Sequence, residues 1–451
     1  MGMQVTEGLA SFAATVKYED IPERVRERTK TLLLDSLACA LAGHQGEETH
    51  QVAAFASALA QSQESSVIGG DRLSLAGATL LNGYLVTAVT MCDVHRPTVT
   101  HVTPEVMPPA LAIAERDRLS GRELLLALAV GCETTTRVGI GLDYQAFRGR
   151  GFHGPGVIGP FGAAAAVGRL LRFDAETMAR AFGLAGSQAA GTFAAWGTPT
   201  VKFHQCRGAL SGLMAALLAQ QRFVATRQFL TAPDGGLYNA YSNGGRPQAV
   251  TDGLGERWEL EQIALRLWPS ASTIQGMITA VFDLVEQHGL IPERTKKLRV
   301  SLGKMAFDMH GGFSRYKGKF EALLSTHYVA AAILHDRALS LGQFEPARYA
   351  DPALVRFAAE RVEVQCEPSL TASQAIVAAE TADGATLTVR CDHPRGSPEN
   401  PLSRGEIEGK FRTYARTRLS ESRVEEAIGI VSRLEQLGST RTLMDTVRAE
   451  K

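Results

Sequence analysis

Segments rich in Ala, Gly and Leu at helical spacing fill the first half of the chain. The clearest covers residues 159–171, where Pro160 fits the first turn of a helix because that turn needs no N–H from it. Further helices are predicted over residues 24–42, 49–60, 74–90, 124–132, 175–184 and 205–220. Helices with so many small residues pack as close pairs in a bundle rather than against a sheet.

Two helix starts carry capping signals. Asp20 is the predicted cap of helix 24–42, with Pro22 in its first turn. Ser120 and Glu123 form a predicted capping box before residues 124–132. These signals support a helical reading of the first 250 residues.

The spacing of apolar residues changes near residue 255. Alternating apolar residues over 297–302 and 361–366 predict strands, and Asp383-Gly384 between two further runs predicts a hairpin. Helices are predicted over 272–288, 320–334 and 403–437. A chain of 451 residues is too long for one ordinary core. We therefore predict a mainly α protein, with a large helical domain built from residues 1–264 plus 396–451 and a smaller α+β domain over residues 265–395.

Charge and cysteine content exclude several classes of protein. Lys plus Arg and Asp plus Glu each number 47, so no bulk attraction to nucleic acid or a membrane is expected. The longest apolar run, residues 124–131, is too short to span a bilayer, and no signal pattern opens the sequence. The six cysteines are scattered without a C-x-x-C pair, which predicts buried thiols in a reducing, cytoplasmic setting.

One polar patch follows the predicted helix 74–90. Asp93, His95, Arg96 and His101 lie within nine residues of one another. A carboxylate beside imidazoles can form an acid/base pair. A metal site is an alternative, although the spacing matches no usual set of ligands, and a plain polar surface loop is another.

A second patch places His153 where a loop rich in Gly and Pro enters the helix at 159–171. The amides and dipole of a helix start favour an anion, so a histidine there suits a ligand with a carboxylate. A solvated loop histidine is the alternative. The letters Gly-x-Gly-x-x-Gly over residues 149–154 match a dinucleotide fingerprint, but no strand precedes them and Pro155 follows, so that reading is set aside.

Two more patches carry cationic or aromatic groups. Lys202, His204 and Arg207 lie at the entry of the predicted helix 205–220 and suit carboxylates, with ordinary capping as the alternative. His310 and Tyr316 lie in a segment rich in glycine, a type of loop that often acts as a lid. A surface tyrosine is the plainer reading of Tyr316.

The four patches, in this order and spacing, resemble the MmgE/PrpD family, the group of 2-methylcitrate dehydratase, cis-aconitate decarboxylase and iminodisuccinate epimerase. The likeness spans nearly the whole chain. It includes Leu-Asp-Ser-Leu at 34–37, Leu-Asn-Gly-Tyr at 81–84, Thr-Val-Lys-Phe-His at 200–204, Asp-Gly-Gly at 234–236, Trp-Pro-Ser at 268–270 and Pro-Glu-Asn-Pro-Leu-Ser at 398–403.

The resemblance implies a homodimer without a metal or other cofactor, in which the α+β domain is a lid and the active site lies between the domains. It places the catalytic roles on Asp93, His101, His153, Lys202 and, at the lid position, Tyr316, with His310 as the alternative there. Substrate binding then falls to His95, Arg96, His204, Arg207 and His310.

This sequence departs from the family pattern at two places. The family's Asp-Phe-Asp-Asp reads Asp93-Val-His95-Arg96, so two acidic positions have become basic. The family's Lys-Pro-Tyr-Pro reads Arg-Leu-Trp-Pro at 266–269. Added positive charge near Asp93 suggests one more carboxylate in the substrate, or one differently placed.

The chemistry implied is proton transfer at a carbon next to a carboxylate. Lys202, helped by Arg96 and Arg207, would bind carboxylates, His101 and His153 would serve as base and acid, and Asp93 would orient a histidine and raise its pKa. The first expectation is a cofactor-independent dehydratase acting on a small di- or tricarboxylate. An epimerase or isomerase, a decarboxylase, and a protein that binds carboxylates without catalysis are the alternatives.

Overall fold

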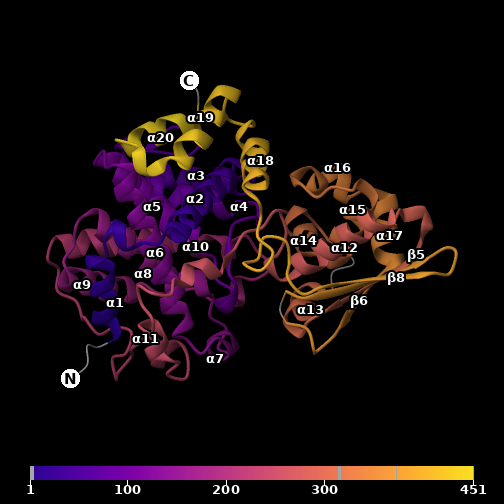
Figure 1. The fold of residues 1–451 in the computed structure, drawn as a ribbon, viewed down its shortest axis with the longest axis horizontal. Helices are drawn as coiled ribbons and strands as arrows, with labels where there is room; N and C mark the ends of the chain where they lie inside the picture. The colour runs from indigo at the N-terminus through magenta and orange to yellow at the C-terminus, as the bar shows by residue number, and fades with distance from the viewer. Residues whose placement is uncertain (1–4, 313–315, 372, 450–451) are drawn as a thin grey trace. The chain divides into compact units, whose positions relative to one another are not determined.

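The computed structural model describes residues 5–312, 316–371 and 373–449, and the prediction of a mainly α protein is confirmed (Figure 1). The chain divides into two compact units. Unit 1 comprises Met1–Ala264 and Ser403–Lys451, and unit 2 comprises Leu265–Leu402. Within the described ranges, no helix is both long enough and apolar enough to cross a membrane.

Unit 1 is a helical bundle with four very short strands. Its α-helices are α1 (Val5–Thr15), α2 (Glu23–Gly43), α3 (Thr49–Ala58), α4 (Leu75–Ala88), α5 (Thr103–Arg116), α6 (Gly121–Ile140), α7 (Tyr144–Gly149), α8 (Gly154–Leu170), α9 (Ala175–Gly186), α10 (Thr200–Gln220), α11 (Leu237–Tyr241), α18 (Arg404–Ala415), α19 (Glu421–Ser432) and α20 (Thr440–Val447). The strands pair as β1 (Ser65–Ser66) with β2 (Arg72–Leu73) and β3 (Val94–His95) with β4 (Ile263–Ala264). Short 3₁₀ turns are η1 (Tyr18–Asp20), η2 (Arg96–Thr98), η3 (Phe193–Ala195), η4 (Pro247–Val250), η5 (Glu259–Gln262) and η9 (Leu434–Gln436).

Helix α8 lies at the centre of unit 1, against α5, α6, α9 and α10. A Cβ added at Gly162 would lie 2.5 Å from the carbonyl oxygen of Gly131 in α6, and one at Gly212 in α10 would lie 2.6 Å from that of Pro160. Real Cβ atoms do not approach so closely, so only glycine allows these helices to meet. The predicted close pairing of helices rich in small residues is confirmed.

Helix α8 begins earlier than the sequence predicted. It starts at Gly154, with His153 as the N-cap residue and Pro155 in the first turn, so Pro160 lies inside the helix. Because proline has no N–H, the carbonyl of Gly156 has no donor four residues on. That oxygen instead accepts from Ala190 N at 3.0 Å and from Arg207 Nη2 at 2.9 Å. The predicted start at residue 159 was wrong because long-range partners replace the missing bond.

Helix α10 also begins earlier than predicted, at Thr200, so Lys202 and His204 lie inside it together with Arg207. Asp20 does not cap α2, since its carboxylate accepts from Lys17 N at 2.9 Å at the end of η1. The capping box of Ser120 and Glu123 is confirmed at the start of α6.

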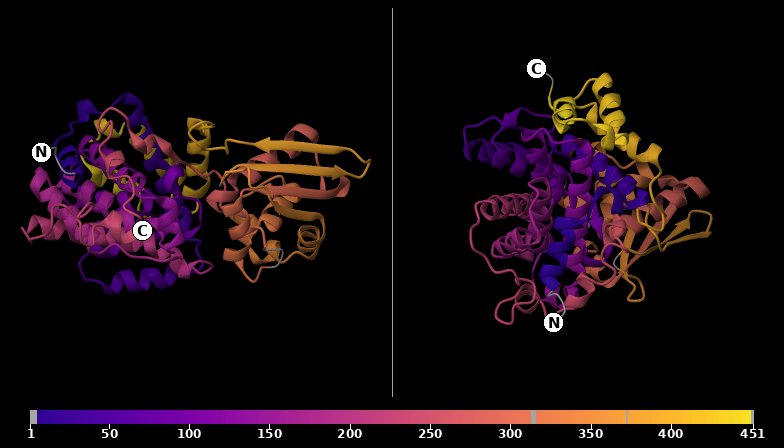
Figure 2. Two further views of the ribbon diagram at one scale, coloured as in Figure 1. Left: turned by 90° about the horizontal axis from the view of Figure 1, so that it is seen from below. Right: turned by 60° about the vertical axis from the view of Figure 1, so that its left-hand side comes forward.

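Unit 2 is a four-stranded sheet with helices on one face, as the left view of Figure 2 shows. The strands β5 (Thr295–Leu302), β6 (Val362–Cys366), β7 (Ala375–Thr381) and β8 (Thr386–Cys391) lie in the order β6-β5-β7-β8. Strands β5 and β6 run parallel, and β7 is antiparallel to β5 and β8. The helices are α12 (Gln275–His288), α13 (Lys304–His310), α14 (Lys319–Leu324), α15 (Thr326–Asp336), α16 (Pro346–Tyr349) and α17 (Pro352–Arg361), with 3₁₀ turns η6 (Ser272–Ile274), η7 (Pro292–Arg294) and η8 (Leu341–Phe344).

Alternation along the strands of unit 2 sets the face that the helices cover. Ala375, Val377 and Ala379 of β7 are buried, and their neighbours are partly exposed. The hairpin predicted at Asp383-Gly384 is confirmed: it joins β7 to β8, and Gly384 has a φ of 90°, which favours glycine. The strands predicted over 297–302 and 361–366 are also confirmed.

Candidate active site

Asp93 lies on a turn between α4 and α5 and is fully buried. Its carboxylate accepts from Val102 N at 3.0 Å, from Thr103 N at 3.1 Å and from the Thr103 hydroxyl. The carboxylate therefore caps the N-terminus of α5, where the first N–H groups of a helix have no partners within the helix. Burial raises the pKa of Asp93, while the Thr103 donors and His101 oppose that rise.

His101 is tied to the same turn through the Asp93 backbone. Its Nδ1 lies 2.6 Å from the carbonyl oxygen of Asp93 and 3.6 Å from the sulfur of Cys92. A carbonyl oxygen accepts only, so Nδ1 of His101 carries the proton, and in the neutral ring Nε2 is the basic nitrogen. The sequence predicted that the carboxylate of Asp93 would orient a histidine; the carbonyl does so instead, because the carboxylate is taken up by α5.

His153 and His204 form a pair of rings. Nδ1 of His153, the N-cap residue of α8, lies 2.9 Å from Nδ1 of His204 in the second turn of α10. His153 is buried and His204 is partly exposed. Burial lowers the pKa of His153 well below its usual value, and His204, His101 and Arg148 lower it further. Burial and then Arg207 lower the pKa of His204.

The His101 and His153 segments lie side by side. A Cβ added to Gly154, next to His153, would lie 2.1 Å from the hydroxyl oxygen of Thr100, next to His101. His101 also acts electrostatically on both Asp93 and His153. The structure thus brings together two patches that are more than 50 residues apart in the sequence.

Lys202 is buried in the first turn of α10. Its ammonium donates to the carbonyl of Ala88 at 2.6 Å, at the end of α4, and lies 3.9 Å from the carboxylate of Glu48. The Tyr84 hydroxyl donates to the same carboxylate at 3.1 Å. The lysine is therefore held in the interior of unit 1, near the turn that carries Asp93.

Two of the residues expected to bind substrate, His95 and Arg207, are engaged in the fold. His95 is fully buried in β3, where its ring lies 2.8 Å from the Thr98 hydroxyl and 3.1 Å from the carboxylate of Glu259. Burial lowers the pKa of His95, so this position adds no positive charge at neutral pH, contrary to the expectation from sequence. Arg207 donates to the carbonyls of Gln188, Gly156 and Ala190 and to Ser211, and Arg96 lies partly exposed at the start of η2.

His310 and Tyr316 belong to unit 2. His310 is buried at the end of α13, with Nδ1 2.9 Å from the carbonyl of Leu324, and burial lowers its pKa to about 4. The Tyr316 ring lies edge-on to Tyr328 and Tyr349, with centroids at 4.9 and 6.3 Å. Burial raises the pKa of Tyr316 to about 12. Residues 313–315 of the predicted lid loop lie outside the described residues.

Sequence reasoning missed Glu105. This residue follows Thr103 in the first turn of α5 and is fully buried between α8 and α10, where Gly159 and Gly208 leave room for it. Among the described residues, neither of its carboxyl oxygens has a hydrogen-bond partner. Burial, followed by Asp93 and Cys92, raises the pKa of Glu105 well above its usual value. Only its contacts with α8 and α10 distinguish it from an exposed glutamate in a first turn.

We expect Glu105→Met to raise the free energy of unfolding by about 1–3 kcal/mol at neutral pH, because it removes buried polar atoms without partners. Above the ordinary glutamate pKa, the unfolded wild-type protein ionises Glu105 more readily than the folded protein does, which lowers the free energy of unfolding increasingly as the pH rises. The stability gained by Glu105→Met should therefore be larger at high pH than at low pH. Urea unfolding at pH 4.5 and pH 8 measures this.

Glu133→Met is the matched control for Glu105→Met. Glu133 is equally buried, but it pairs with Arg137 at 2.7 Å and accepts from the backbone of Glu259 and Leu260. The same substitution should therefore destabilise the protein there. A loss of stability in both variants would contradict the reading of Glu105 as a site without partners.

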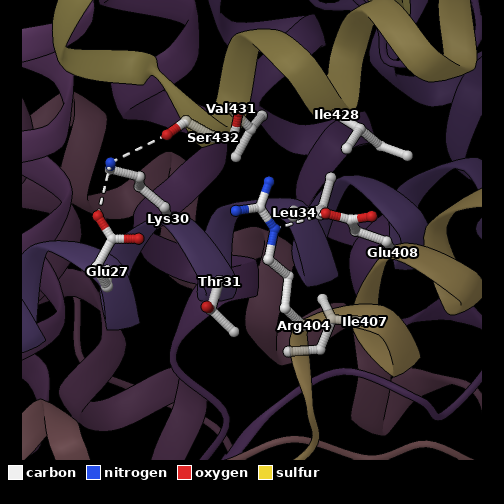
Figure 3. A pocket seen from close by; sticks show the side chains of 10 residues that line it. All are labelled: Glu27, Lys30, Thr31, Leu34, Arg404, Ile407, Glu408, Ile428, Val431 and Ser432. Atoms are coloured by element: carbon white, nitrogen blue, oxygen red, sulfur yellow. Dashed lines mark hydrogen bonds and ion pairs between the residues drawn. The ribbon is translucent and has the colours of Figure 1, made fainter.

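Two surface cavities of unit 1 lie apart from these residues. One of about 340 Å³ is lined by residues that include Thr98, Tyr144 and Arg246. The other, of about 60 Å³, lies among α2, α18 and α19, and its charged side chains pair with one another, Lys30 with Glu27 and Arg404 with Glu408 (Figure 3). In the part of the chain that the structure describes, no group of three or more His, Cys, Asp or Glu side chains is arranged to hold a metal ion.

Comparison with known proteins places this chain in a family. The model of the MmgE/PrpD N-terminal domain matches residues 7–249, and that of the MmgE/PrpD C-terminal domain matches residues 268–436. A cis-aconitate decarboxylase-like protein of Aspergillus oryzae is 29% identical, over 99% of this chain and 98% of its own. Human cis-aconitate decarboxylase is 29% identical (96% and 92%), and that of Aspergillus terreus is 27% identical (98% and 95%).

These matches run over both units and nearly the full length of each relative, and they support a lyase-type function. The two family models together cover more than half of the chain. This protein belongs to the MmgE/PrpD family.

Proposed function

We propose that this protein is a cofactor-independent lyase that acts on a small tricarboxylate or dicarboxylate by proton transfer next to a carboxylate. The observation that carries the proposal is the grouping of His101 and His153 on adjoining segments of unit 1, one ring tied to the Asp93 turn and the other paired with His204. Lys202 supplies a buried cation at the end of α4. A base, an acid and a cation are the groups that this chemistry needs.

Decarboxylation is the first reaction to test, because the full-length relatives named above are cis-aconitate decarboxylases or resemble them. When a carbon next to a carboxylate loses CO₂, the electron pair left behind is stabilised by a nearby cation, and the carbon then takes a proton. Lys202 would stabilise the charge and His153 would give the proton. Where the double bond shifts, His101, whose neutral ring has a basic Nε2, would take a proton from one carbon and return it at another, so that the overall reaction still consumes one proton.

Dehydration remains the second candidate. The same base and acid would remove a proton next to the carboxylate and protonate the departing hydroxyl, so no net proton is taken up. Epimerisation needs only the removal of the proton next to the carboxylate and the return of a proton to the same carbon. The arrangement in unit 1 suits each of these reactions, and they differ in what leaves the substrate. The hydrogen bond between His101 Nδ1 and the Asp93 carbonyl does not favour decarboxylation, dehydration or epimerisation over the others.

The test is an activity screen with cis-aconitate, citrate, isocitrate and 2-methylcitrate, followed by NMR in deuterated water. Release of CO₂ with one deuterium in the product identifies a decarboxylase. Gain or loss of water identifies a dehydratase, and deuterium in an otherwise unchanged skeleton identifies an epimerase. Binding of a polycarboxylate, seen as thermal stabilisation without any product, would contradict an enzymatic function and support a carboxylate-binding protein.

Two expectations from the resemblance are retained as proposals. The first is a homodimer, which sedimentation analysis of the purified protein would test. The second is participation of Tyr316 or His310 of unit 2 in the reaction. Tyr316→Phe and His310→Asn would separate them, since the variant of the participating residue should lose turnover and the other should not.

A further inference from the structure

The pairing of His153 with His204 has chemical consequences beyond binding. Both contacting atoms are Nδ1, and they are 2.9 Å apart, a hydrogen-bonding distance. One nitrogen must donate and the other accept, so the two rings hold a single proton between them. Because each neutral ring carries one proton, the position of the shared proton fixes the state of both outer nitrogens.

The surroundings of the pair hold both rings in place. The backbone N–H of His153 donates to the carbonyl of Gly191 at 3.0 Å. Gly191 has a φ of 129°, and a Cβ there would lie 3.0–3.3 Å from three atoms of the His204 ring. The Phe193 ring is edge-on to His153, with centroids 5.1 Å apart, and the Arg148 guanidinium lies 3.5 Å from the centre of Phe193. A single glycine thus binds the backbone of His153 and leaves room for the ring of His204.

The two rings differ in exposure. His153 is 7% exposed, whereas His204 is partly exposed. Among the described residues, His204, His101 and Arg148 lower the pKa of His153 electrostatically, and Arg207 lowers that of His204. An additional positive charge on His153 would therefore be buried beside other cationic groups. A route that keeps this ring neutral during proton transfer avoids that cost.

We propose a proton relay in which His204 keeps His153 neutral while His153 gives up a proton, by passing it the shared proton of the Nδ1–Nδ1 hydrogen bond. This inference rests on the proposed function, in which His153 gives a proton to the substrate. The proton leaves Nε2 of His153, the shared proton moves from Nδ1 of His204 to Nδ1 of His153, and water supplies a proton to Nε2 of His204. Both rings end neutral. After product leaves and water reaches Nε2 of His153, the transfers run in reverse: water reprotonates that nitrogen, the shared proton returns to Nδ1 of His204, and Nε2 of His204 gives its proton back to water. His204, expected from sequence to bind substrate, is on this reading a positioning residue that acts through His153.

The relay explains why a decarboxylase would pair a buried histidine with an exposed one. Each loss of CO₂ consumes one proton from solvent. While substrate is bound, the buried ring delivers that proton, and the partly exposed ring can take a compensating proton from water. Removal of His204 should therefore slow turnover more than it weakens substrate binding.

The test compares His204→Asn with His204→Ala. An asparagine amide can still bond Nδ1 of His153, but it cannot pass a proton on. We expect kcat to fall about 10–100-fold in both variants, with little change in KM, and free imidazole to restore part of the activity of His204→Ala. The loss should be greatest at high pH, where solvent protons are scarce. Wild-type kcat in His204→Asn would overturn the relay and leave only a positioning role.

A second measurement does not depend on the substrate. Histidine-selective ¹⁵N labelling should reveal one ring N–H shared by the two Nδ1 atoms, which is lost in His204→Ala. Two rings that each titrate independently near their ordinary pKa would overturn the pair and the relay with it. If the shared proton is present but no polycarboxylate is turned over, the proposed function fails while the pair stands.

Discussion

Replacing His153 by Asn should lower kcat on the substrate found in the polycarboxylate screen by about 10²–10⁴-fold, the usual contribution of a general acid or base. The amide can still bond Nδ1 of His204, but it has no group that can give up or accept a proton at the position of Nε2. Steady-state kinetics over a range of pH measures the effect, and KM should change much less than kcat.

The fold should tolerate His153→Asn. His153 is the N-cap residue of α8 and makes no side-chain cap of its own, whereas Asn is a favoured N-cap. The thermal midpoint should therefore hold or rise while activity is lost. His50→Asn is the control, since His50 is exposed on α3 and should keep full turnover. Substantial activity in His153→Asn would remove His153 from the proposed mechanism.

Replacing Lys410 by Met should lower the free energy of unfolding by about 3–5 kcal/mol, the usual cost of leaving one buried charge without its partner. Lys410 of α18 and Asp35 of α2 form an ion pair at 2.6 Å, and both side chains are 1% exposed. Their charges are held together in the interior, where the Asp35 carboxylate has little access to water. Urea unfolding followed by circular dichroism measures the loss.

The double variant Lys410→Met with Asp35→Leu separates the cost of an unpaired charge from the loss of the pair itself. It should recover most of the lost stability, because replacing a whole buried pair by apolar residues is often neutral. Arg412→Met on the same helix is the control: it breaks a surface pair with Glu425 and should change stability little. Equal losses in the single and double variants would contradict this account.

The same double variant tests a link to the candidate site. Lys410 also donates to the carbonyl of Met91 at 3.2 Å, and Met91 lies two residues before Asp93. The pair thereby fixes the turn that holds Asp93 and His101. We expect the double variant to be stable but to have reduced kcat, because this backbone tie is lost. The motif Leu-Asp-Ser-Leu at 34–37 then has a physical role: its aspartate anchors the lysine that holds the turn.

Sequence patterns predicted the elements of this protein well where local chemistry decides them. The capping box at Ser120 fixed the start of α6, and Asp383-Gly384 fixed the hairpin between β7 and β8, because each signal acts within four residues. The glycines of α8 and α10 predicted close helix pairs for the same reason, since the absence of a side chain is a local property. The resemblance to the MmgE/PrpD family was confirmed by the family models.

Only the tertiary structure decided which of the polar residues meet. Pro160 resembled a helix start, but Ala190 and Arg207 satisfy the carbonyl that it leaves open, and the helix begins at Gly154. His95 and Arg207 resembled substrate ligands, yet partners far along the chain engage both. His153 and His204 lie 51 residues apart, and the sequence around neither of them indicates that the two rings meet. The sequence by itself determined the helices, the hairpin and the family, because those depend on neighbouring residues; burial and long-range hydrogen bonds decided the roles of the charged groups.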